Sequence, residues 1–143
     1  MKTLKQLLDQ RPRQAVCVKP DDSIYSALEL MAKHEIGAVL VMENNHLAGI
    51  FSERDYARKI TLHGKNSRET KVREIMTEKV LYVDPGTTVD QAMALMTEKR
   101  VRHLPVLDGN RNVIGMISIG DLVKETICEQ AFIIQQLEHY ITS

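Results

Sequence analysis

The chain has 143 residues, and its 19 Lys and Arg residues balance 19 Asp and Glu residues, so its formal net charge is zero. Hydrophobic residues make up 43% and charged residues 27%, a composition typical of globular proteins rather than disordered ones. The charge balance argues against a broad nucleic-acid-binding or membrane-binding surface, and 4% aromatic residues argue against a platform for base stacking.

Cysteine and histidine are too sparsely placed to predict a metal site or a disulfide framework. Cys17 and Cys128 lie far apart, and the five histidines form no HxxxH or HxH pair. The N-terminal residues do not resemble a signal peptide, and no apolar run reaches the length of a membrane span. We therefore expect a reduced, soluble, cytoplasmic protein that holds no metal and does not contact a membrane.

In chain order, the first half predicts a strand, a helix, a hairpin and the start of a second helix. Valine-rich or alternating apolar runs bounded by turn residues predict strands at residues 15–18, 38–42 and 47–52. Apolar residues that recur at i, i+3, i+4 and i+7 predict a helix over residues 23–34, with Asp22 or Ser23 as its N-cap. A second helix is expected directly after Ser52.

The second half predicts the same elements in the same order. Strands are expected at residues 80–83, 104–107 and 113–118. A helix is expected over residues 88–99, with Thr87 and Asp90 as its capping pair. The last helix is expected to begin after Ser118 and to run to about Tyr140.

The two halves are copies of one β-α-β-β-α unit. Val18-Lys19-Pro20 aligns with Val83-Asp84-Pro85 at an offset of 65 residues, and one extra residue near Asp108 then moves the offset to 66. A single insertion in a turn is how duplicated units usually diverge, because loops tolerate changes of length. We predict an α+β fold with copies at residues 12–62 and 72–126 and a helical extension at 127–143. A copy of about 60 residues is marginal alone, so the two should pack together.

The last helix carries a longer apolar stripe than a small module needs. The stripe consists of Val123, Ile127, Ala131, Ile134, Leu137 and Ile141. Two interpretations are open: the stripe packs on the N-terminal segment around Leu4, Leu7 and Leu8, or it contacts a second subunit.

One motif, G-h-h-S-x-x-D, occurs in both copies at a strand-to-helix junction, over residues 49–55 and 115–121. Serine at an N-cap with an acid three residues later is a capping box, and that structural role explains the motif without a ligand. The same geometry suits a nucleotide. Unpaired N–H groups at a helix start favour a phosphate, and a carboxylate one turn later can accept hydrogen bonds from ribose hydroxyls. The two interpretations are compatible.

The duplicated unit, with both motifs in register and a V-x-x-L-P-V segment at residues 101–106, resembles a tandem CBS-domain pair, the regulatory module of the cystathionine-β-synthase type. The resemblance covers about residues 12–126. It implies a pseudo-twofold pair of repeats with extra helical segments at both termini, and two clefts between the repeats. Such pairs commonly bind AMP, ADP, ATP or NAD(H), and sometimes S-adenosylmethionine.

The resemblance also implies site residues. Asp55 and Asp121 would hold ribose hydroxyls. The phosphate would be contacted by Ser52, Arg54, Ser118, Arg102 and His103. The adenine pocket would be lined by Val16, Ile36, Ala38, Leu81 and Val101.

Each cleft would mix the two copies, so that Asp121 faces the pocket of Val16 and Ile36, and Asp55 faces that of Leu81 and Val101. Two of these site residues can also be explained without a ligand. Arg54 is equally explained as a solvated arginine at a helix start, and His103 as a partly buried, hydrogen-bonded histidine.

The expected function is a stand-alone regulatory module that binds an adenine nucleotide between its repeats and signals to an unidentified protein in trans. The alternative is a ligand-free dimerisation or interaction scaffold. Catalysis is not expected, because the serine at Ser118 lacks the glycine two residues before it that a nucleophile elbow requires. By resemblance the module is expected to form a homodimer, and no nucleic-acid partner is expected.

Overall fold

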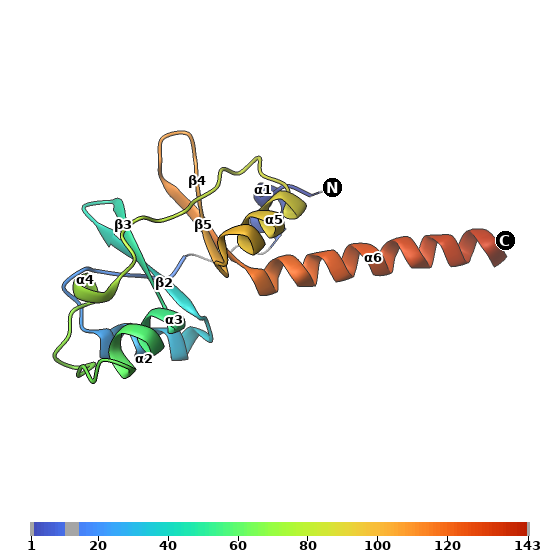
Figure 1. Cartoon of the computed structure of the whole chain (residues 1–143). Helices are drawn as coiled ribbons and strands as arrows, with labels where there is room; N and C mark the ends of the chain where they lie inside the picture. The colour runs from blue at the N-terminus through green and yellow to red at the C-terminus, as the bar shows by residue number, and fades with distance from the viewer. Residues whose placement is uncertain (1, 11–14, 143) are drawn as a thin grey trace.

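The computed structural model describes residues 2–10 and 15–142, so residues 1 and 143, and residues 11–14 at the expected start of the first copy, lie outside the description. Figure 1 shows the arrangement of the elements. In chain order they are α1 Leu4–Gln10, β1 Cys17–Val18, α2 Ile24–His34, β2 Ala38–Glu43, β3 His46–Ser52, α3 Glu53–Asp55, the π-helical turn η1 Tyr56–Thr61, α4 Val72–Ile75, α5 Val89–Lys99, β4 His103–Leu107, β5 Val113–Ser118 and α6 Ile119–Thr142.

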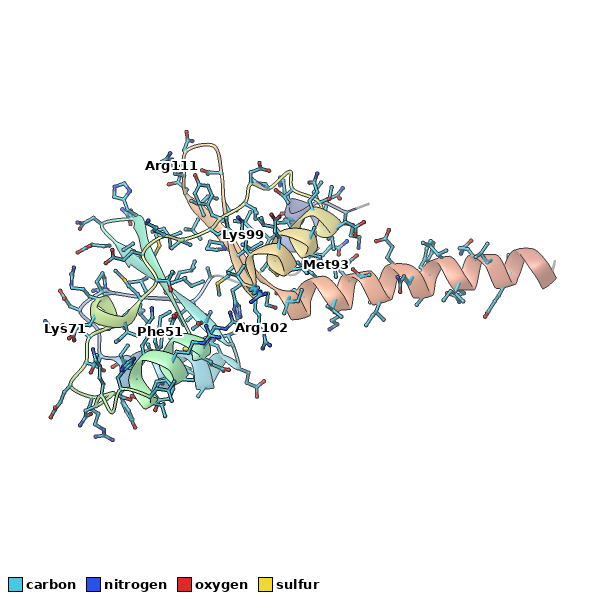
Figure 2. All side chains as sticks on the ribbon, in the orientation of Figure 1. Phe51, Lys71, Met93, Lys99, Arg102 and Arg111 are labelled. Atoms are coloured by element: carbon cyan, nitrogen blue, oxygen red, sulfur yellow. The ribbon has the colours of Figure 1, made fainter. Side chains whose placement is uncertain are left out.

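The first copy, repeat 1, is built on a sheet in the order β1-β2-β3. Strand β1 runs parallel to β2, and β2 pairs antiparallel with β3 in a register that places Ala38 opposite Ser52. Apolar side chains of the sheet and of α2, η1 and α4 form its core, which contains Val18, Ile24, Ala27, Met31, Val39, Val41, Phe51, Ile60, Val72 and Ile75. Figure 2 shows Phe51 inside this repeat.

The second copy, repeat 2, has the hairpin β4-β5, in which His103 lies opposite Ser118. The strand expected at residues 80–83 is reduced to one parallel bridge between Val83 and Val106. The reason is Pro105, which occupies the position of Leu40 in repeat 1. Leu40 donates its N–H to the carbonyl of Val16 at 3.0 Å, and proline has no N–H with which to make that bond.

The equivalent helices α2 and α5 each begin at a capped residue and end at a left-handed one. Ser23 is the N-cap of α2, as expected, whereas the cap of α5 is Thr88, which forms a capping box with Gln91. The expected pair of Thr87 and Asp90 is therefore wrong by one residue. Thr87 instead belongs to the preceding turn, where its backbone N–H donates to the carbonyl of Asp84 at 3.2 Å.

The N-terminal helix α1 belongs to the core of repeat 2. Leu4 and Leu7 are 0% and 2% exposed and lie in the core cluster that also contains Leu122. The backbone before α1 is tied to repeat 2 by a bridge between Thr3 and Thr88. The structure is therefore an α+β arrangement of two repeats, as the sequence predicted, and α1 completes the second repeat.

Helix α6 packs on repeat 2 only through its first turns. Leu122 and Glu125 are buried, and Lys2 forms a salt bridge with Glu125 at 2.8 Å. Beyond them α6 projects away from both repeats (Figure 1), and Ile134 is 55% exposed. Packing of the whole stripe on the N-terminal leucines is therefore wrong, because α6 leaves repeat 2 after its first turns and only Leu122, which is not part of the stripe, shares a core with Leu4 and Leu7. No helix among the described residues combines the length and apolarity that crossing a membrane requires.

Candidate functional site

Both S-x-x-D motifs form complete capping boxes. The N–H of Ser52 donates to Oδ2 of Asp55 at 3.0 Å, and the N–H of Asp55 donates to Oγ of Ser52 at 3.3 Å. In repeat 2 the corresponding distances between Ser118 and Asp121 are 3.0 and 3.1 Å. Each box engages one carboxylate oxygen of the aspartate. The capping role is thus real in both repeats, and the second carboxylate oxygen of Asp55 has other partners.

The second oxygen of Asp55 points to groups that the sequence analysis did not select. Thr77 Oγ1 donates to Asp55 Oδ1 at 3.3 Å, and Lys59 Nζ lies 3.4 Å from the same oxygen. Lys59 could have been found from its i+4 spacing to Asp55 on a helix. Thr77 could not, because it reaches the site through a bridge between its backbone and that of Ile50 in β3.

A cavity of about 460 Å³ opens beside the first motif and is shared by the two repeats. Its wall combines the motif residues Ser52, Arg54 and Asp55 with residues of repeat 2. Repeat 2 supplies Thr77, Lys79, Val80, Leu81, Val101, Arg102 and His103. The structure therefore brings Asp55 and the apolar pair of Leu81 and Val101 to one cavity. Figure 2 shows Arg102 at the junction between the two repeats.

The wall of this cavity is rich in positive charge. Five Lys and Arg side chains line it against two carboxylates, which gives a net charge of +3 when the histidine is neutral. The cations are Arg54, Arg58, Lys59, Lys79 and Arg102, and the carboxylates are Glu53 and Asp55. Because the whole chain is neutral, this concentration is a local property of the cavity. A cavity of this charge attracts anionic ligands.

His103 lies at the start of β4 and closes the cavity against repeat 1. A Cβ atom added to Gly37 would lie 3.3 Å from Cε1 and 3.4 Å from Nε2 of the imidazole. Burial lowers the pKa of His103 from its ordinary value of 6.5, and Asp121 and Glu53 partly oppose this shift. The imidazole is therefore neutral at pH 7 and can donate one hydrogen bond and accept another. His103 is partly buried, as one interpretation expects, and its contact with a phosphate stays a prediction.

Arg54 is exposed but ordered by a contact across the repeats. Its Nη1 donates to the backbone carbonyl of Arg100 at 2.7 Å. Arg100 is the C-cap of α5, where carbonyl groups lack helical partners and carry the negative end of the helix dipole. Arg54 is thus held by a specific hydrogen bond rather than simply solvated. It also lines the cavity, so a phosphate bound there would lie close to its guanidinium group.

The remaining residues selected from the sequence lie outside the wall of this cavity. Val16 and Ile36 are half-buried against the core of repeat 1, and Ala38 has no exposed surface. Ser118 and Asp121 form the second capping box, although Asp121 is close enough to influence the pKa of His103. Their roles in a second cleft stay predictions. Among the described residues, no group of three or more His, Cys, Asp or Glu side chains could hold a metal ion.

The sequence model of the CBS domain matches residues 11–62 and 72–127, and the chain therefore belongs to the CBS-domain family. A CBS domain-containing protein of Arabidopsis thaliana, the mitochondrial CBSX3, is 46% identical over 126 residues, which are 85% of this chain and 61% of the relative. The chain thus spans less than two thirds of that relative.

Solved structures share the fold. A CBS-domain protein from Burkholderia ambifaria is 52% identical with a TM-score of 0.86, over 90% of this chain and 96% of the other. The CBS domain pair of protein MJ0100, solved with 5′-methylthioadenosine and S-adenosyl-L-methionine, is 22% identical with a TM-score of 0.79, over 90% of this chain and 98% of the other. The second similarity concerns the fold alone.

Proposed function

We propose that this protein is a non-catalytic regulatory module whose cavity binds a phosphorylated adenine nucleoside, namely AMP, ADP, ATP or NAD(H). The observation that carries the proposal is the shared cavity itself, in which the Asp55 motif of repeat 1 faces Leu81 and Val101 of repeat 2 within a strongly basic wall. Family membership supports the regulatory role, because CBS repeats bring no catalytic constellation of their own.

Each part of the wall suits one part of a nucleotide. Oδ1 of Asp55, whose partners Thr77 and Lys59 are at 3.3 and 3.4 Å, is the acceptor for ribose hydroxyls. Leu81 and Val101 offer apolar surface to the adenine ring. The phosphate contacts fall to Ser52 at the helix start and to Arg54, Arg102 and His103 around the same cavity.

The charge of the wall also bears on which adenosyl ligand is bound. The ligands solved with MJ0100 carry no phosphate, and S-adenosylmethionine has a cationic sulfonium. A wall with five Lys and Arg side chains against two carboxylates disfavours a cation and favours phosphate groups. We therefore expect nucleotides to bind more tightly than S-adenosylmethionine.

A ligand that touches both repeats can act as a signal. If its contacts differ between two arrangements of the repeats, binding shifts the population toward one of them. We expect a protein target to respond to that shift in trans. We also expect the module to be a homodimer and to act in the cytoplasm. A second cleft, with Asp121 and Ser118 facing Val16, Ile36 and Ala38, is proposed as the weaker site.

The alternative is a ligand-free scaffold, and one observation favours it: both capping boxes are complete without a ligand. In that case the aspartates would serve only to begin α3 and α6. The two functions differ in what the loss of a carboxylate does, since a cap contributes to stability alone.

Titration calorimetry with AMP, ADP, ATP, NAD(H) and S-adenosylmethionine separates these functions, with Asp55→Ala and Asp121→Ala as a matched pair. We expect saturable nucleotide binding that weakens at least tenfold in Asp55→Ala and changes little in Asp121→Ala. A ligand at about 100 times its dissociation constant should stabilise the fold by about 2.7 kcal/mol. Binding lost only in Asp121→Ala would move the site to the second cleft. No binding, with each variant losing only about 1 kcal/mol of stability, would establish the scaffold.

A further inference from the structure

The distal part of α6 presents apolar side chains to solvent. Ile127, Ile134 and Leu137 are 59%, 55% and 57% exposed, respectively. Figure 1 shows that this part of the helix extends beyond both repeats, and Figure 2 shows its side chains projecting on all sides. Contiguous exposed apolar surface commonly marks an interaction site. The exposed apolar side chains of α6 therefore indicate that this part of the helix contacts a partner.

The spacing of these residues is that of a coiled coil. From Val123 onward the stripe continues through Ile127, Gln130, Ile134, Leu137 and Ile141, with alternating steps of four and three residues. This alternation is the heptad pattern of two helices that supercoil around each other. Isoleucine occupies one of the two core positions throughout, and Val123, Gln130 and Leu137 occupy the other. The side of α6 that packs on repeat 2, with Leu122 and Glu125, is offset from this seam.

We propose that α6 is a dimerisation helix that pairs with α6 of a second copy of this chain in a parallel, in-register coiled coil. A seam of this spacing needs a partner with the same spacing, and an identical helix supplies it. Isoleucine at the first core position favours a parallel, two-stranded coiled coil when leucine fills the second, as Leu137 does here. The proposal rests on no property of the ligand cavity, whose wall contains no residue of α6.

Gln130 and the flanking positions favour the parallel orientation. In register, the amide of Gln130 meets that of Gln130 of the partner subunit, so each can hydrogen-bond to the other. In an antiparallel pair the amide would face isoleucine, where a buried polar group has no partner. Beside the seam, Ile133 would face Glu138 of the partner subunit, whereas Thr126 lies toward repeat 2, where its Oγ1 is 3.3 Å from Sδ of Met93. No like charges meet at these positions.

Sedimentation equilibrium of the full chain tests the contact, with Ile134→Glu as the disrupting variant. Phe132→Glu is the matched control, because Phe132 is 62% exposed but lies on the opposite side of the helix from the seam. We expect the dimer dissociation constant to rise at least tenfold in Ile134→Glu and to stay within about twofold in Phe132→Glu. A monomeric wild type, an unchanged Ile134→Glu variant or an equal effect of the control would overturn the proposal. Circular dichroism of both variants confirms that the repeats remain folded.

Disulfide trapping tests the orientation. Gln130→Cys and Leu137→Cys are introduced one at a time into a chain that also carries Cys17→Ser and Cys128→Ser, and each variant is oxidised and run on a non-reducing gel. In parallel, in-register helices both positions lie opposite themselves, so both variants should form covalent dimers. An antiparallel pair can bring at most one position opposite itself. Trapping of one position alone, or of neither, would overturn the parallel arrangement. Nucleotide affinity should be unchanged in Ile134→Glu, which separates this test from that of the cavity.

Discussion

Arg54 Nη1 donates a 2.7 Å hydrogen bond to the backbone carbonyl of Arg100, which joins the motif of repeat 1 to the end of helix α5 in repeat 2. The two residues are 46 positions apart in the chain. Arg100 has a φ of 55°, and the equivalent residue of repeat 1, Glu35, has a φ of 53°. The duplicated helix end is therefore conserved in conformation, but in repeat 2 its carbonyl receives a side chain from the opposite repeat. A phosphate that drew Arg54 into the cavity would change this contact between the repeats.

Replacing Arg54 with alanine should separate ligand binding from stability. The side chain is exposed, so losing one hydrogen bond should lower the free energy of unfolding by at most about 1 kcal/mol. The same change removes a cation from the cavity wall, and the affinity for ATP should fall about tenfold. Urea unfolding and calorimetry on the one variant measure the two effects. A loss of several kcal/mol without a change in affinity would make Arg54 a purely structural link.

The paired glycines Gly49 and Gly115 occupy equivalent positions of the two repeats but meet different neighbours. A Cβ at Gly49 would lie 2.8 Å from Met76 Sδ and 2.8 Å from the backbone oxygen of Thr77, whereas a Cβ at Gly115 would meet only side-chain atoms of Leu8, at 2.8 Å and beyond. Backbone cannot move aside as a leucine methyl can. We expect Gly49→Ala to cost about 2–3 kcal/mol and Gly115→Ala about 1 kcal/mol or less, by urea unfolding. Equal costs would contradict this account.

A methyl group on Gly37 should narrow the cavity. It would lie 3.3 Å from Cε1 of His103, so the imidazole must shift by a few tenths of an ångström. We expect Gly37→Ala to weaken nucleotide binding several-fold while it changes the stability by less than about 1 kcal/mol. Gly109→Ala is the control, because a Cβ there would meet nothing within 4 Å. Calorimetry that found the two variants equal to wild type would show that His103 does not position the ligand.

The stability of the fold should depend on pH through His103. Burial lowers its folded pKa below the ordinary value of 6.5, so the unfolded chain binds a proton first as the pH falls. The contribution of the neutral imidazole to the stability of the fold is therefore fully present above about pH 6.5, and it is lost as the pH falls through the folded pKa of His103. In wild type, the free energy of unfolding should decrease as the pH falls from about 7.5 to about 5. In His103→Gln this decrease with pH should be smaller. Identical slopes would mean that the group responsible is not His103.

Local patterns in the sequence were sufficient for most of the secondary structure. The strand at 113–118 was predicted with the bounds observed, and the hairpins and the helices α2 and α5 were predicted within one or two residues. The prediction failed where a single chemical property overrode the pattern. Pro105 has no N–H, so the strand expected at 80–83 is reduced to one bridge. Thr87 hydrogen-bonds within the turn at Asp84, so the N-cap of α5 is Thr88 instead.

By itself, the sequence determined the duplication, the α+β class and the two S-x-x-D capping boxes, because repeats, apolar periodicity and caps depend on residues close together in the chain. Only the tertiary structure decided which surfaces meet. It placed α1 in the core of repeat 2, joined Thr77 to Asp55, and left the seam of α6 exposed. Two similar repeats offer equivalent faces, so a choice between them rests on the packing of residues distant in sequence, which periodicity does not encode.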